Sequence, residues 1–261
     1  MNIPRRKPLT ANVGIIGVGL DTYWAQFDGL LDEMMGKLSQ FESKVAANSV
    51  AVSNFGMIDN AEAAYSNIGA MKAADLDLLF VDMVTYATSA TFGVLVRELT
   101  CPIVLVALQP LSAMPYAKAT TFTQLVNDDF CAVPEFTGVA IRFGKPVADV
   151  IIGMRGDDAS ADAGIASWCR VAHALHDLRR ARIGLMGHVL EAMYDMHVDP
   201  TAVTRTFGCH VAVCEPDEIL GFYENRDEAA IAAPAIAGES LPIAAMGMPM
   251  PLNRNAKRRF C

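Results

Sequence analysis

One stretch late in the chain decides the expected fold: it reads DLRRARIGLMGH, from Asp177 to His188. Arginines gather where a helix should end, an apolar strand begins near Arg182, and Gly187 closes that strand. Cations stabilise the negative end of a helix dipole, so the order helix then strand is physically consistent. A buried strand this late in the chain predicts that a second α/β domain begins here.

The residues before this stretch predict a long helix over 158–181. Apolar side chains recur at spacings of three and four from Ile165 to Leu175, which gives one apolar stripe. Asp157, Asp158 and Asp162 crowd its start, which suits the positive end of the dipole. We expect this helix to bridge two domains.

Short apolar runs alternate with amphipathic stretches from residue 13 onward. The runs cover 13–19, 50–55, 76–84, 102–108 and 147–153. Such alternation is typical of a parallel sheet covered by helices on both faces. The expected fold class is therefore α/β, with two consecutive Rossmann-like, doubly wound parallel-sheet domains. The first should span 11–157, and the second, incomplete one 182–232.

The second domain shows helix signals after its first strand. A helix is expected near 189–196, and another should begin at Pro200, with Asp199 as its N-cap and Gly208 as its stop. A strand then follows over 210–214, and a further helix runs to about residue 232. The segment 233–261 has four prolines and no periodicity, so we expect an irregular C-terminal tail.

The composition excludes several classes of partner. The net charge is −8 and no basic stripe exists, so the sequence predicts no nucleic acid partner. No apolar run is long enough to span a bilayer, which predicts no membrane partner. The six cysteines form no C-x-x-C pair, as is usual for reduced thiols in a cytoplasmic protein.

Most candidate binding residues follow the expected strands, where α/β sheets bind small molecules, and Asn127 and Asp128 lie in an acidic turn that leads into a helix. Polar and aromatic side chains at these ends suit a sugar or polyol. The substrate-binding candidates in the first domain are Asp21, Thr22, Tyr23, Tyr86, Gln109, Asn127 and Asp128. In the second domain, His188 and Glu191 follow the strand that ends at Gly187.

Each of these patterns also has a structural interpretation. The turn after the first strand, 17–22, lacks the third glycine of a dinucleotide fingerprint, so a simple glycine turn is favoured. Acids near 127–131 could cap a helix instead of binding a ligand. Zinc at Cys209, His210 and Cys214, or metal at the His173–His176 pair, lacks a complete ligand set in the sequence.

Several short motifs resemble the L-arabinose/L-fucose isomerase family, particularly its divergent isomerase-like members. They are the turn 21–24, the segment from Asn127 through RFGKP at 142–146 to the Trp168 helix, RIGLMG at 182–187, and Phe207-Gly208. The resemblance covers about residues 11–232. It implies carbohydrate metabolism, aldose–ketose isomerisation with Mn²⁺, and sites formed between subunits of a homo-oligomer.

The resemblance does not supply a complete catalytic site. The family holds its metal with two glutamates and two histidines from the later part of the chain, whereas the last histidine here is His210. We carry over no metal ligand and no catalytic residue, and Cys131 stands where relatives place a substrate-facing histidine. The expected function is a partial isomerase, inactive alone, with the metal as a cofactor of the full-length family.

Two other functions remain open from the sequence. Two Rossmann-like lobes joined by a helix also describe a sugar-binding or sensory module without catalysis. A two-domain racemase would use one cysteine from each lobe, for which Cys101 and Cys209 are the candidates.

Overall fold

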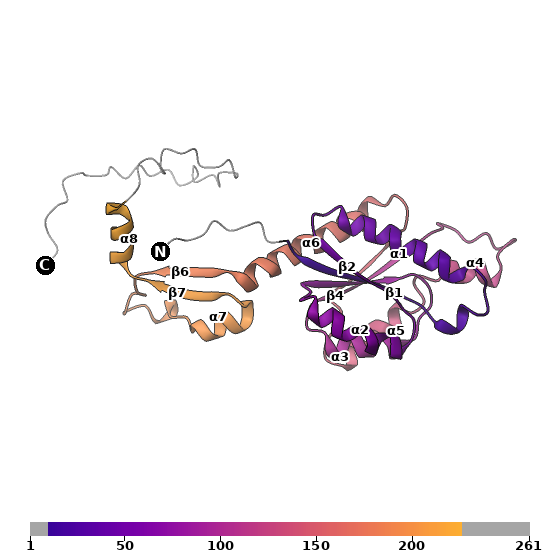
Figure 1. Cartoon of the computed structure of the whole chain (residues 1–261), viewed down its shortest axis with the longest axis horizontal. Coiled ribbons are helices and arrows are strands. Elements are labelled where there is room, and N and C mark those ends of the chain that lie inside the picture. The colour runs from indigo at the N-terminus through magenta and orange to yellow at the C-terminus, as the bar shows by residue number, and fades with distance from the viewer. Residues whose placement is uncertain (1–9, 226–261) are drawn as a thin grey trace. The chain divides into compact units, whose positions relative to one another are not determined.

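The computed structural model describes residues 10–225 of the chain (Figure 1). It divides into two compact units: residues 10–183 with 198–211, and residues 184–197 with 212–225. The expected tail over 233–261 and the last part of the second domain, 226–232, lie outside the described residues. The predicted domain boundaries therefore stay predictions.

The larger unit contains a five-stranded parallel sheet. Its strands are β1 (Asn12–Val18), β2 (Ala51–Ile58), β3 (Leu78–Met83), β4 (Ile103–Gln109) and β5 (Asp149–Met154). They lie in the order β2-β1-β3-β4-β5, and every neighbouring pair is parallel. This confirms the expected Rossmann-like α/β fold. The order changes direction between β1 and β3, which marks the switch point of the sheet.

Helices cover both faces of this sheet, as Figure 1 shows. Helices α1 (Leu30–Ala46) and α6 (Ala159–Arg180) pack on one face. Helices α2 (Ala61–Ala73), α3 (Ser89–Glu98) and α5 (Val133–Arg142) pack on the other. Coverage of both faces explains why β3 and β4 are almost continuously apolar.

Each face has its own aromatic contact. Phe41 of α1 meets Phe80 of β3 edge to face at 5.6 Å between ring centroids. On the other face, Phe92 stacks on Phe136 at 4.5 Å. All four rings are fully buried, so these pairs join helices to the sheet and to each other through the largest side chains of the core.

A third apolar cluster lies at the carboxyl edge of the sheet. Leu30 and Met34 of α1 meet Val84, which follows β3, and Leu125 of the short helix α4 (Thr121–Val126). The side chain of Tyr23, at the end of the 3₁₀ turn η1 (Asp21–Tyr23), packs against the same cluster. The packing of these apolar side chains joins α1 and α4 to the carboxyl edge of the sheet.

The long helix expected over residues 158–181 is confirmed as α6. One oxygen of Asp158 caps α6 by accepting the N–H groups of Ser160 and Ala161, and the other accepts the N–H of Met154. These bonds lower the pKa of the Asp158 carboxyl. A basic cluster, Arg179 and Arg180, lies in the last turn, as the helix dipole favours.

The amino edge of the sheet is tied to α6 by a buried histidine. His176 Nδ1 lies 2.7 Å from Asp77 Oδ2, and the backbone N–H of Asn12 donates to the same oxygen. Asp77 is fully buried and His176 almost so. His176 of the H-x-x-H pair is therefore engaged in joining α6 to the strands.

A second parallel pair follows α6. Strands β6 (Arg182–Met186) and β7 (His210–Cys214) form a two-stranded sheet. His210 N–H donates to the Ala181 carbonyl and Gly187 N–H to the Cys214 carbonyl, so the strands run in the same direction. Helices α7 (Pro200–Phe207) and α8 (Pro216–Glu224) complete the described elements here.

The helix signals around α7 are confirmed. The carboxylate of Asp199 accepts the N–H of Thr201. Gly208 ends the helix at φ 77°, and a Cβ there would lie 3.0 Å from the Cα of Arg179. Both the backbone angle and the close approach of α6 therefore require glycine at this position.

Two expectations for the second domain were wrong. Strand β6 is exposed along its whole length rather than buried, because a two-stranded sheet leaves its faces uncovered within the described residues. The expected helix over 189–196 is irregular apart from a single 3₁₀ turn, η2 (Tyr194–Met196). Its apolar side chains, such as Leu190 at 60% exposure, cover no core formed by the described residues, and short isolated helices are unstable.

None of the helices within residues 10–225 is long and apolar enough to cross a membrane.

Two adjacent methionines of α1 test the packing of the larger unit. Met34 is fully buried and Met35 is 41% exposed. Met34→Ala should lower the free energy of unfolding by about 2–5 kcal/mol, since it leaves a cavity at the carboxyl edge. Urea denaturation followed by tryptophan fluorescence measures the change. Met35→Ala is the matched control, and an equal loss in both variants would contradict the burial of Met34.

Candidate functional site

The candidate site lies at the carboxyl edge of the sheet, above the switch point between β1 and β3. Three separate segments meet there: the η1 turn after β1, the residues after β3, and the turn 127–131 after α4. In open α/β sheets the switch point at the carboxyl edge is the usual place for a small ligand.

Two tyrosines from different segments face each other at this edge. The ring centroids of Tyr23 and Tyr86 lie 6.5 Å apart, with 48° between the ring planes. Both side chains are half-buried. Burial raises the pKa of both hydroxyls, so both stay protonated at neutral pH and can donate hydrogen bonds.

The turn 127–131 adds a carboxylate and a thiol. Asp128 and Cys131 interact with each other, and both act electrostatically on Tyr23 and Tyr86. Burial raises the pKa of Asp128, and burial together with the Asp128 charge raises the pKa of Cys131. The Cys131 thiol is therefore protonated at neutral pH, and it is a poor nucleophile.

A second acid lies beside this group. Glu135 of α5 accepts the backbone N–H of Ser89, at the start of α3, with 2.8 Å between the atoms. Its charge raises the pKa of Tyr86 and of Cys131. Glu135 is not among the candidates predicted from the sequence, and the packing of α5 against α3 places it beside the site.

Side-chain contacts hold the η1 turn in place. Trp24 Nε1 donates to Asp59 at 2.7 Å, and Asn60 Nδ2 donates to Asp21 at 3.0 Å. The carbonyl of Thr22 accepts the side-chain amide of Gln26. Asp21 and Thr22 are exposed, so of the candidates in this turn Tyr23 is the one that faces the cluster.

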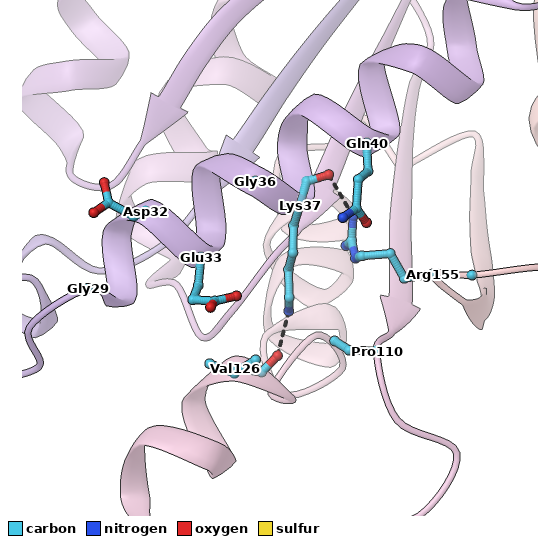
Figure 2. Close-up of a pocket in the computed structure, with 10 residues that line it drawn as sticks. Gly29, Asp32, Glu33, Gly36, Lys37, Gln40, Pro110, Val126 and Arg155 are labelled. Carbon is cyan, nitrogen blue, oxygen red and sulfur yellow. Dashed lines mark hydrogen bonds between the residues drawn. The ribbon is translucent and has the colours of Figure 1, made fainter.

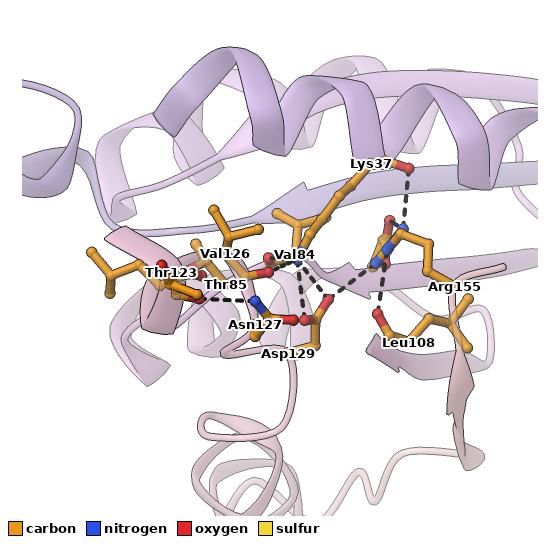
Figure 3. A network of polar contacts seen from close by, with 11 residues as sticks. Lys37, Val84, Thr85, Leu108, Thr123, Val126, Asn127, Asp129 and Arg155 are labelled. Carbon is orange, nitrogen blue, oxygen red and sulfur yellow. Dashed lines mark hydrogen bonds and ion pairs between the residues drawn. The ribbon is translucent and has the colours of Figure 1, made fainter. Parts of the chain in front are cut away.

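A buried ionic network lies beneath the turn 127–131 (Figure 3). Lys37 of α1 reaches across the carboxyl edge and is 5% exposed. Its ammonium donates to the carbonyls of Val84 and Val126, at 2.7 and 2.6 Å, and to both oxygens of Asp129, at 3.0 and 3.1 Å. All three of its donors are used.

Arg155, directly after β5, completes the network. It donates to both oxygens of Asp82, at 3.0 and 2.8 Å, and to Asp129 at 3.2 Å. Its remaining donors reach the carbonyls of Leu108 and Lys37. Both carboxylates are fully buried, so two cations neutralise two anions out of contact with water.

Burial and pairing act in opposite directions on the acids of this network. Burial raises the pKa of Asp129 to about 6, against the opposing charges of Lys37 and Arg155. Burial also raises the pKa of Asp82 and lowers the pKa of Lys37.

This network was not predicted from the sequence, although signals for it exist there. Lys37 lies on the buried stripe of α1 that Leu30, Met34 and Phe41 define. Asp82 interrupts an otherwise apolar buried strand. A charged residue at an apolar position predicts a buried partner, but spacing alone cannot say which one.

Gln109 and Asn127 share a neighbouring pocket of about 420 Å³ near the ends of β4 and β5. Its walls are mostly apolar and include Met114, Phe130 and Ile152. Asn127 donates to the Thr123 carbonyl at 2.8 Å, and its Oδ1 is buried without a partner in the described part of the chain. These two candidates therefore lie together, in a pocket apart from the tyrosine pair.

Another pocket, of about 610 Å³, lies against α1 (Figure 2). Asp32, Glu33 and Gln40 line it, together with Lys37 and Arg155. Figure 2 shows Lys37 reaching the Val126 carbonyl and Arg155 reaching the Lys37 backbone. Since both cations use all their donors inside the protein, they offer none to a ligand.

The candidates of the second domain belong to the smaller unit. His188 and Glu191 are both exposed, and His188 Nε2 lies 3.9 Å from Glu215 Oε2. Among residues 10–225, these two side chains therefore form no buried site.

The metal and thiol alternatives find little support among residues 10–225. No group of three or more histidine, cysteine, aspartate or glutamate side chains there could hold a metal ion. Cys209, His210 and Cys214 do not form such a group within the described residues either. Burial raises the pKa of Cys101 to about 11, which disfavours the thiolate that a racemase would need.

Comparisons with known proteins add no further identification. The chain matches no protein-family model. A search of curated proteins also finds no match. The relationship to the isomerase family stays a prediction from the motifs.

Removal of Arg155 tests the energetic role of the network. Arg155→Leu should lower the free energy of unfolding by about 3–5 kcal/mol, because it leaves buried carboxylates with too little positive charge. Thermal and urea unfolding at neutral pH measure the loss. Arg142→Leu, at an exposed position, is the control and should leave stability almost unchanged. A stable Arg155→Leu protein would show that the pairing is not required.

Proposed function

We propose that this chain binds a small polyhydroxylated molecule, a sugar or polyol, at the carboxyl edge of its parallel sheet. One observation carries the proposal: Tyr23, Tyr86, Asp128 and Cys131 come from three separate segments and gather at the switch point. Ligand sites of α/β sheets lie at this position.

The chemistry of the group suits such a ligand. The faces of Tyr23 and Tyr86 offer apolar surface for the C–H groups of a sugar, while their hydroxyls offer donors and acceptors. The Asp128 carboxylate accepts hydrogen bonds from ligand hydroxyls. Hydrogen bonds to a charged group are about twice as strong as neutral ones, so Asp128 should contribute most of the polar specificity.

The motif resemblance supports a wider proposal, that the chain is a partial aldose–ketose isomerase of carbohydrate metabolism that is inactive alone. The described residues supply no metal group, so we derive no isomerisation step for them. We expect negligible turnover of L-arabinose or L-fucose by the purified chain when Mn²⁺ is added. Measurable turnover that depends on Mn²⁺ would contradict this expectation.

Titration calorimetry with a panel of pentoses, 6-deoxyhexoses and their polyols tests the binding. Asp128→Asn should weaken the best ligand of the panel at least about tenfold, since a charge-assisted hydrogen bond contributes roughly 1.5–3 kcal/mol. Asp32→Asn is the matched control, because Asp32 is an exposed acid of α1. Binding of no ligand in the panel, or equal affinities in both variants, would overturn the proposal.

A further inference from the structure

The turn that carries Asp128 and Cys131 has a deeply buried residue at its centre. Asp129 is fully buried, whereas Asp128 is half-buried and Cys131 exposed. The same short turn therefore directs the Asp129 carboxylate into the protein. It places the Asp128 carboxylate and the Cys131 thiol on the side of the tyrosines.

One ammonium group connects this turn to the other parts of the site. Besides Asp129, Lys37 holds the carbonyl of Val84, two residues before Tyr86, and the carbonyl of Val126, two residues before Asp128. Figure 3 shows these bonds converging on the Lys37 side chain. The relative position of Tyr86 and Asp128 thus depends on contacts that Lys37 makes.

We propose that Asp129 is the positioning residue of the candidate site. Its ionised carboxylate holds the turn 127–131 in the arrangement that binds the ligand, and acidification releases this turn. This regulation rests on the proposed function, because it concerns the same site. The charged groups that face Asp129 are Lys37 from α1, Arg155 after β5 and Asp82 from β3.

The titration of Asp129 gives the direction of the effect. Burial raises its pKa from 3.8 to about 6. Below this pH the neutral acid accepts weaker hydrogen bonds from Lys37 and Arg155, so the turn 127–131 loses its anchor. Ligand binding therefore falls as the pH falls through about 6.

Global stability should not follow the same course. The pKa of Asp129 is about 6 in the folded protein and 3.8 in the unfolded chain, so the folded protein takes up the proton at a higher pH. Acidification from about 6 to 3.8 therefore does not lower the free energy of unfolding through Asp129. The stabilisation from protonated Asp129 is fully present below 3.8 and is lost as the pH rises through about 6. A loss of binding without a loss of stability distinguishes positioning from general unfolding.

Nuclear magnetic resonance of the full chain without ligand tests the positioning directly. Between about pH 4.5 and 8, the backbone amides of Asp128, Phe130 and Cys131 should shift together, with a midpoint near 6. Asp129→Asn should abolish this transition and hold the signals near their acid positions. Asp128→Asn should keep it, although the pKa of Asp128 is also raised. Constant amide signals in the unmodified protein, or a transition that survives in Asp129→Asn, would overturn the inference.

Calorimetry at two pH values separates this inference from the proposed function. The affinity for the best sugar or polyol of the panel should fall by up to about tenfold for each pH unit below 6, for one linked proton. Asp129→Asn should bind weakly at both pH values. If the amides titrate and no ligand of the panel binds, the positioning stands and the proposed function fails. If a ligand binds equally at both pH values, with constant amide signals, the proposed function stands and the positioning fails.

Discussion

The buried network of Lys37, Asp129, Arg155 and Asp82 is the constraint on which the carboxyl edge depends. Two cations and two carboxylates lie out of water, and the donors of both cations are all used. Such an arrangement contributes little net stability compared with an apolar core of the same volume, but it tolerates few alternative geometries. The network thereby joins α1, the end of β3, the residue after β5 and the turn 127–131 in one arrangement.

The position of this ionic network explains why the candidate site lies at the carboxyl edge of the sheet. A parallel sheet brings the ends of its strands to one edge, and the switch point between β1 and β3 is where open α/β sheets usually bind ligands. The apolar cluster of Leu30, Met34 and Leu125 closes the base of that edge. The ionic network then orients the turn above it, so that Asp128 and Cys131 act electrostatically on Tyr23 and Tyr86.

The pocket beside α1 and the switch point differ in how many of their polar groups are already hydrogen-bonded within the protein. In the pocket beside α1, Lys37 and Arg155 are fully engaged inside the protein. At the switch point, the tyrosine hydroxyls and Asp128 lie at an accessible edge with pKa values raised by burial. A ligand gains most where polar groups are accessible and already oriented, which favours the switch point as the binding site.

Local patterns in the sequence were sufficient for the fold class, for the caps at Asp199 and Gly208, and for the acids at the start of α6. They also placed Tyr23 and Tyr86 after strands and Asp128 in an acidic turn. These features depend on hydrophobic periodicity and short-range hydrogen bonds, which neighbouring residues determine. The exposure of β6, the irregular segment 188–193 and the pairing of Lys37 with Asp129 could not be predicted in this way. Residues 92 positions apart meet only when the sheet and its helices close, and burial depends on which elements cover a strand. Long-range packing therefore decided which charged side chains became the anchor of the site and which stayed at its surface.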